Sequence, residues 1–214
     1  CRLLCTKAQC AVIAIDYRLA PEARFPAAVE DCWAAVQWVK ASGSELDLDT
    51  NRVAVGGDSA GGNLAAVTAL MARDAGLDLK LQMLVYPATD ASQHYESFSE
   101  NEAGPLLTVE VIDWFWSHYV GPELKEGVRN DWRFSPALAA NHEDLAPAYV
   151  ATCSADPLRD EGNAYAETLS LAGVPVKHSL FEGEPHLLFQ MFHTCEGAKR
   201  LIEECAAAVA AAFE

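Results

Sequence analysis

One stretch of this chain combines an apolar strand, a turn crowded with glycine, and a helix. Residues 53–55 are apolar, the turn reads Gly-Gly-Asp-Ser-Ala-Gly-Gly, and a helical run extends from Asn63 to Arg73. The turn fits the pattern G-x-S-x-G, which holds a serine hydroxyl above a parallel sheet on a sharp strand-to-helix turn. Glycine tolerates such a turn, and a side chain two residues before or after the serine is expected to collide with the opposing backbone. The stretch therefore predicts a nucleophile elbow at Ser59, with an ordinary helix cap as the alternative.

Composition narrows the classes of protein that carry such a turn. The chain has 214 residues, 51% of them hydrophobic, so one sizeable core and a single domain over residues 1–214 are expected. A formal net charge of −16 disfavours binding to nucleic acid or to anionic lipid. The apolar segment 206–213 is too short to span a bilayer, and no signal segment opens the chain. A cytoplasmic enzyme without nucleic-acid partners or membrane insertion is predicted.

The cysteines give no sign of a metal site. There are seven, an odd number, and none of them shows C-x-x-C spacing, so neither zinc nor a disulfide framework is indicated. Reduced thiols that pack as small apolar side chains are expected, and the alternative of a cysteine nucleophile lacks any family-type signature. The residues are Cys1, Cys5, Cys10, Cys32, Cys153, Cys195 and Cys205.

Apolar runs alternate with helical segments along the chain. Parallel strands separated by helices of this length predict an α/β fold with a mostly parallel, doubly wound sheet. Strands are expected at 10–17, 52–57, 81–86, 148–155 and 176–181, and helices at 1–8, 27–41, 63–73, 108–119, 160–172 and 192–213.

The alternation breaks between residues 89 and 136. Residues 100–105 are expected to form a loop and residues 121–136 an irregular segment. An excursion of this size between strands is typical of a lid or pocket wall. Its helix carries Trp114, Phe115 and Trp116, which either line a pocket or pack the helix onto the sheet.

Three candidate catalytic residues each follow a predicted strand. Ligands of open α/β sheets bind beyond the carboxyl ends of the strands, which is where Ser59, Asp156 and His186 are expected. Their order of serine, acid and histidine is that of α/β-hydrolases. Asp156 could instead cap the next helix, with Asp160 as the reserve acid. His186 is preferred because it alone lies on a Gly/Pro-marked loop directly after the last strand; the competitors are His94, His118, His142, His178 and His193.

Four linked segments resemble the hormone-sensitive-lipase-like (bacterial family IV) carboxylesterases of the α/β-hydrolase fold. They are Asp16–Glu22, Phe25–Asp31, Gly57–Ala65 and Asp156–Gly162. The resemblance implies that Ser59 is the nucleophile, Asp156 the acid and His186 the base. It also implies a helical cap contribution, and a scaffold role for Arg18 and Glu22, paired or hydrogen-bonded near the site.

The sequence departs from this family at the oxyanion hole. The family's His-Gly-Gly-Gly segment belongs before Cys1 and is absent, which leaves the Ala60 N–H as the remaining donor. Because losing one donor costs about 100- to 1000-fold in turnover, a chain of this extent alone is expected to be a poor catalyst. We expect an upstream segment to exist, with a strand between residues 10–17 and 52–57.

A second departure is Leu187, where the family usually has glycine. Its isobutyl group is expected to narrow the pocket. An apolar wall that suits modest acyl or alcohol groups is predicted from Leu187, Leu188 and Phe189 together with the three aromatic residues of helix 108–119.

The sequence thus predicts a serine carboxylesterase that acts on short-chain esters in lipid metabolism through an acyl-enzyme, without a cofactor or metal. The alternatives are a non-catalytic small-molecule receptor on the same fold, as in the gibberellin receptors, and an acyltransferase or peptidase with the same triad. An exposed edge on the last strand would permit a homodimer.

Overall fold

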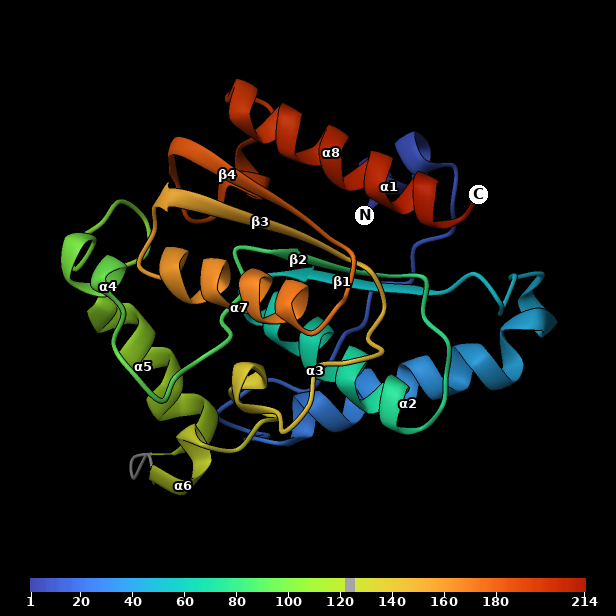
Figure 1. Cartoon of the computed structure of the whole chain (residues 1–214), viewed down its shortest axis with the longest axis horizontal. Coiled ribbons are helices and arrows are strands. Elements are labelled where there is room, and N and C mark those ends of the chain that lie inside the picture. Colours follow the sequence, from blue (N-terminus) through green and yellow to red (C-terminus); the bar gives the residue numbers. More distant parts are fainter. Residues whose placement is uncertain (122–125) are drawn as a thin grey trace.

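Four parallel strands form the sheet at the centre of the molecule (Figure 1). The computed structural model describes residues 1–121 and 126–214. The strands β1 (Ala54–Asp58), β2 (Leu81–Val85), β3 (Ala148–Ala155) and β4 (Val176–Pro185) lie side by side in chain order. Each pair is parallel, so the carboxyl ends of all four meet at the same edge of the sheet. The predicted parallel α/β sheet is confirmed.

Helices cover both faces of the sheet, as expected for a doubly wound fold. On one face lie α2 (Ala27–Ser42), α3 (Ala60–Asp74) and α7 (Arg159–Leu171), and on the other lie α1 (Arg2–Ala8) and α8 (Glu196–Ala212) (Figure 1). Successive strand residues point to opposite faces, so each face receives its own apolar cluster. Leu84 and Val150 pack with α3 and α7, whereas Tyr149 and Phe181 pack with α8. Each such fully buried side chain contributes about 1.5–3 kcal/mol.

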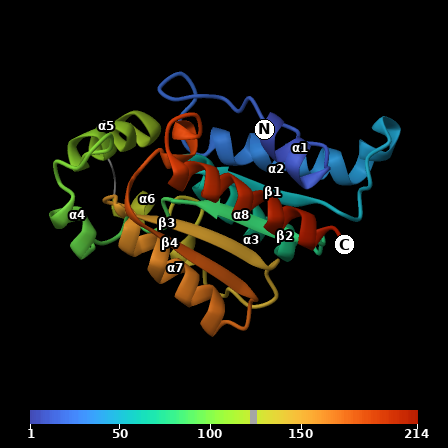
Figure 2. The same cartoon turned by 90° about the horizontal axis from the view of Figure 1, so that it is seen from above.

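The excursion between β2 and β3 contributes three further helices. They are α4 (Glu96–Glu100), α5 (Val109–Val120) and α6 (Glu126–Arg129). Figures 1 and 2 both place α4 and α5 beyond the same end of the sheet. The helix predicted at 108–119 is confirmed as α5, whereas α4 was not predicted. Part of the segment expected to be irregular, residues 122–125, lies outside the described residues.

The predicted strand at residues 10–17 is wrong. This segment has no strand assignment, and its apolar side chains Val12, Ile13 and Ile15 are exposed by 37%, 45% and 37%. A strand needs a neighbour that accepts and donates its backbone hydrogen bonds. The part of the chain that the structure describes places no strand beside this segment, so an apolar composition alone does not make it one.

Two other predicted boundaries shift near the carboxyl end of the chain. Strand β4 continues through Gly183 to Pro185, because its pairing with β3 resumes after an irregularity between Cys153 and Ala155. The loop predicted at these residues is therefore strand. The last helix starts at Glu196 rather than at residue 192, and a short 3₁₀ helix, η3 (Leu188–Met191), precedes it.

In the part of the chain that the structure describes, no helix has both the length and the apolar character needed to cross a bilayer.

Candidate active site

Ser59 lies at the turn of the backbone between β1 and α3. Its φ of 56° and ψ of −120° are strained values for a residue with a side chain. The Ser59 N–H donates to the Val85 carbonyl at 2.9 Å, which ties the turn to the neighbouring strand β2. Ser59 is also the N-cap residue of α3, so its hydroxyl stands at the positive end of a helix.

The glycines of this turn are not equally constrained. A Cβ added at Gly57 would collide with the backbone of Gly61, and one at Gly62 would lie 2.9 Å from Pro87 Cβ. A Cβ at Gly61, by contrast, would meet no described atom within 4 Å. The collision predicted on both sides of Ser59 therefore occurs on the side of Gly57, and the tight position after Ser59 is Gly62.

A chain of hydrogen bonds joins Ser59 to His186 and Asp156. His186 Nε2 lies 2.9 Å from Ser59 Oγ, and His186 Nδ1 lies 2.6 Å from Asp156 Oδ2. An ionised carboxylate only accepts hydrogen bonds, so Nδ1 carries the proton and Nε2 accepts from the serine hydroxyl. The three residues follow β1, β3 and β4, which is the placement expected from the sequence.

Asp156 is completely buried and uses both of its carboxylate oxygens. While Oδ2 faces the imidazole, Oδ1 accepts the N–H of Leu158 at 2.9 Å, at the N-terminus of α7. The capping alternative and the acid prediction thus apply to the same side chain. This second hydrogen bond fixes the rotation of the carboxylate beside His186.

Tyr86 packs against the imidazole of His186, with the two rings tilted by 56°. The ring centroids of Tyr86 and His186 are 4.6 Å apart, and the Tyr86 hydroxyl contacts Asp58 Oδ2 at 3.2 Å and accepts the Phe189 N–H at 3.2 Å. Burial, and then the charge of Asp58, raise the pKa of the Tyr86 phenol well above its ordinary value, so it stays a hydroxyl. Tyr86 therefore connects the turn before Ser59 with the loop after His186.

The sequence interpretation missed Tyr86, although a signal was present. Tyr86 directly follows β2, at the same edge of the sheet as Ser59 and Asp156. The rule that residues after strands line the site would have included it.

The remaining oxyanion candidate, the Ala60 N–H, lies in the first turn of α3. Helices have no internal acceptor for the N–H groups of their first turn. Among the described residues, the Ala60 N–H donates no hydrogen bond. It is therefore placed, next to Ser59, where it could meet a developing negative charge.

The predicted pocket residues occupy different environments. Trp114 and Phe115 are 56% and 53% exposed on α5, whereas Trp116 packs beside the apolar cluster around Phe98. Leu188 is completely buried in the core facing α8, so, contrary to the prediction, it has no surface to offer a ligand. On the loop after His186, Leu187 and Phe189 are half-buried, and Leu187 takes a left-handed φ of 62°.

The other acid and the other histidines lie outside this chain of hydrogen bonds. Asp160 binds Arg159 and the Ser97 N–H instead of an imidazole. His142 is buried against the Pro136 carbonyl, and His178 contacts the Thr152 hydroxyl. His94 packs on Phe98, His118 on Trp114 and His193 on Phe192.

Arg18 is hydrogen-bonded and ion-paired, as expected, and its partners are acidic residues of α2. The Arg18 guanidinium binds Asp31 on α2, with Nη2 at 2.7 Å and Nε at 2.9 Å, and also reaches Glu30. These hydrogen bonds lower the pKa of the Asp31 carboxyl. Helix α2 brings Asp31 next to Arg18, although the two residues are thirteen positions apart in the sequence. Residues 1–121 and 126–214 contain no group of three metal-ligating side chains that could hold an ion.

Comparison with known proteins gives consistent matches. Residues 1–190 match a family model described as the alpha/beta hydrolase fold. The chain is 46% identical over 176 residues to carboxylesterase NlhH of Mycobacterium tuberculosis, which covers 80% of this chain and 54% of that relative. It is 43% identical over 204 residues to the carboxylic ester hydrolase LipN of the same organism, covering 92% of this chain and 54% of that relative.

A solved esterase structure has the same fold as this chain. The monoclinic form of the Pyrobaculum calidifontis esterase superimposes with a TM-score of 0.94 at 39% identity, over 100% of this chain and 70% of the other. The chain therefore spans about half the length of the curated relatives it matches.

Proposed function

Because the chain belongs to the hormone-sensitive-lipase-like family of the α/β-hydrolase fold, we propose that this protein is a serine carboxylesterase that cleaves short-chain esters through an acyl-enzyme. The observation that carries the proposal is the continuous path of hydrogen bonds from Ser59 Oγ through His186 to Asp156 Oδ2. Relatives named as carboxylesterases, at 43–46% identity, support the same reaction class.

In the proposed reaction, His186 Nε2 takes the proton of Ser59 while Ser59 Oγ attacks the ester carbonyl. Asp156 Oδ2 holds the Nδ1–H tautomer and stabilises the imidazolium that forms. The imidazolium then gives its proton to the departing alkoxide, which leaves as an alcohol. A water molecule, deprotonated by the same imidazole, then attacks the acyl carbonyl. The bond to Ser59 Oγ breaks, the carboxylic acid leaves, and the imidazolium returns its proton to Ser59 Oγ.

When Ser59 attacks the ester, negative charge develops on the carbonyl oxygen, and a hydrogen-bond donor must stabilise it. We assign the Ala60 N–H to this role because it lies one residue after Ser59, in the first turn of α3. For contact with the ester we propose Leu187 and Phe189, since both follow His186 within three residues and are half-buried. Trp116, and the exposed Trp114 and Phe115, are proposed as a more distant wall on α5.

Substitution of Ser59 tests the proposal directly. In Ser59→Ala, turnover of p-nitrophenyl acetate should fall by roughly 10⁴- to 10⁶-fold, because no nucleophile remains. Ser170→Ala, an exposed serine on α7 far along the helix from the site, should leave turnover unchanged. Equal rates in Ser59→Ala and the wild type would remove Ser59 from the mechanism.

A covalent probe separates the enzyme from a receptor on the same fold. A fluorescent phosphonate should label the wild type and not Ser59→Ala, whereas a receptor would bind its ligand and leave the probe intact. Product analysis separates the related reactions: hydrolysis releases acid and alcohol in equal amounts, and acyl transfer yields a new ester. A cytoplasmic location, a role in lipid metabolism and a homodimer stay predictions.

A further inference from the structure

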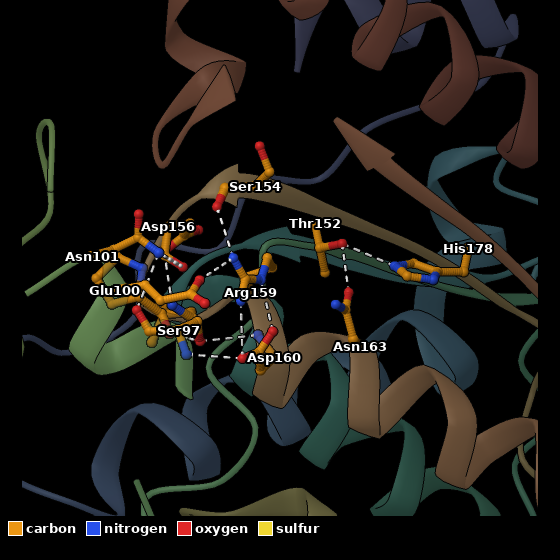
Figure 3. Close-up of polar contacts among 12 residues, drawn as sticks. Ser97, Glu100, Asn101, Thr152, Ser154, Asp156, Arg159, Asp160, Asn163 and His178 are labelled. Atoms are coloured by element: carbon orange, nitrogen blue, oxygen red, sulfur yellow. Dashed lines mark hydrogen bonds and ion pairs between the residues drawn. The ribbon is translucent and has the colours of Figure 1, made fainter. Parts of the chain in front are cut away.

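The turn that carries Asp156 is held by side chains from outside the sheet (Figure 3). Two carbonyls of this turn, and one near the end of β3, accept hydrogen bonds from side chains. Ser97 Oγ donates to the Pro157 carbonyl at 2.6 Å, Arg159 Nη1 to the Ser154 carbonyl at 3.3 Å, and Asn101 Nδ2 to the Asp156 carbonyl at 3.4 Å. The Ser97 bond has the usual length of an O–H···O hydrogen bond, whereas the two N–H···O contacts are longer than is usual for their type.

Ser97 makes two further hydrogen bonds to the same region. Its own N–H donates to Asp160 Oδ2 at 2.8 Å, and its Oγ accepts the Asp160 N–H at 3.2 Å. Ser97 is completely buried on α4, and its hydroxyl is used as donor and as acceptor. Removing this hydroxyl would leave the Pro157 carbonyl and the Asp160 N–H without partners in the interior, an arrangement that proteins avoid.

Charged neighbours reinforce this attachment. Asp160 Oδ1 accepts from Arg159 Nε at 2.7 Å, and Arg159 Nη1 forms an ion pair of 2.7 Å with Glu100 Oε2 on α4 (Figure 3). Burial opposes ionisation of Asp160, yet the hydrogen bonds from Arg159 and from Ser97 lower the pKa of this carboxyl overall. Helix α4 and the start of α7 are thus joined by both neutral and ionic contacts.

We propose that Ser97 is a positioning residue for Asp156: by clamping the turn at Pro157 and Asp160, it aims the Asp156 carboxylate at His186. The role in turnover rests on the proposed function. Ser97 belongs to α4, in the excursion between β2 and β3, and not to the sheet. A helix outside the sheet therefore sets the position of the Asp156 carboxylate, and we call its contacts with Pro157 and Asp160 the clamp. The reserve acid Asp160 acquires a role as the partner of Ser97.

The experiment compares Ser97→Ala with Ser135→Ala in the full chain. Ser135 is an unusually close match: it is completely buried in the same excursion, donates to the Arg129 carbonyl at 2.6 Å and accepts the Ala91 N–H at 3.0 Å. It has no described contact with the turn of Asp156. Both variants should lose stability, and only Ser97→Ala should change the position of the Asp156 carboxylate relative to His186.

Two readouts distinguish positioning from stability. Short hydrogen bonds between a carboxylate and an imidazole are charge-assisted, so the wild type should show a low-field proton resonance for His186 Nδ1–H. In Ser97→Ala we expect this resonance to move upfield, and kcat for p-nitrophenyl acetate to fall about 10-fold with KM changed less than twofold. Ser135→Ala should retain the wild-type resonance and kcat. Should Ser97→Ala not fold, Asn101→Ala, which removes a longer contact to the same turn, should shift the resonance in the same direction by a smaller amount.

The results distinguish a failure of the proposed clamp from a failure of the proposed esterase function. An upfield shift in a protein without esterase activity would support the clamp and reject the esterase. An active wild type whose resonance and kcat stay equal in Ser97→Ala and Ser135→Ala would reject the clamp and leave the esterase standing. A wild type without any low-field resonance would contradict the short bond on which the clamp depends.

Discussion

At the scale of single residues, the most unusual group outside the proposed mechanism is Glu161. It is 1% exposed, its Oε1 accepts the N–H groups of Thr89 and Asp90, and its Oε2 has no hydrogen-bond partner among the described residues. Burial raises the pKa of the Glu161 carboxyl well above its ordinary value, against the two N–H donors, and the charges of Asp90 and Asp156 raise it further. The folded protein therefore favours the protonated acid.

This shift gives the free energy of unfolding a definite dependence on pH. Below the ordinary value of about 4.5, Glu161 is protonated in both states and no stability is lost. As pH rises toward the raised folded pKa, the unfolded chain loses the proton first, so stability falls. Glu161→Gln keeps an acceptor for Thr89 and cannot ionise; its thermal midpoint relative to the wild type should therefore increase between pH 4.5 and 8.

The matched control for this prediction is Glu167→Gln, an exposed position on the same helix. Its thermal midpoint should follow that of the wild type at every pH. A Glu161→Gln protein whose midpoint runs parallel to the wild type over the whole range would show that Glu161 does not contribute the slope.

Individual residues were predictable to different degrees. Ser59, Asp156 and His186 each follow a strand, so position along the chain was enough to select them. The partner of Arg18 depended on the three-dimensional placement of Asp31, and Leu188 depended on which way a 3₁₀ turn faces. Neither is encoded in local spacing.

At the scale of elements, the elbow between β1 and α3 makes the clearest mutational prediction. Gly57→Ala introduces a methyl group against the Gly61 backbone, which cannot move without opening the turn, and should destabilise the protein by more than about 2 kcal/mol. Gly61→Ala places its methyl group in open space within a helix and should stabilise it by up to about 1 kcal/mol. Urea unfolding, followed by circular dichroism, measures both.

Each variant adds one methyl group to the same five-residue motif, at a different position, so each is the control for the other. Equal midpoints in urea would mean that the elbow does not have the tight backbone approach described here.

The elements themselves show where sequence patterns succeed. The strands β1 to β3 and the helices α3, α5 and α7 were predicted within a few residues. Apolar runs specify these strands, and apolar residues at helical spacing followed by a glycine specify these helices. Helix α4, which supplies Ser97, has only five residues. So short a segment does not repeat the helical pattern of apolar residues, and no pattern in the sequence therefore indicates it. The segment 10–17 has the composition of a strand, but pairing needs a neighbour as well.

At the scale of the whole molecule, the formal net charge of −16 affects the stability of the fold. The sequence has 31 acidic and 15 basic side chains, so repulsion between like charges opposes the compact state. Raising sodium chloride from 0.01 to 0.1 M shortens the screening length from about 30 to about 10 Å. The thermal midpoint at pH 7.5 should therefore rise with salt.

Titration toward lower pH provides the control for this effect. The net charge shrinks as pH approaches the isoelectric point of about 4.6, and the benefit of salt should shrink with it. A midpoint that is unchanged or lower in 0.1 M salt at pH 7.5 would show that local ion pairs outweigh the overall repulsion.

The order of the strands has one further consequence. Ser59 follows β1 and His186 follows β4, so the two reacting side chains come from the two edge strands of the described sheet. Fraying of β4 alone would separate base from nucleophile while the helices kept their ellipticity. Under mild chemical stress, product formation should therefore decline well before the far-ultraviolet spectrum does, and an assay of hydrolysis would be the earliest indicator of ageing in a stored preparation.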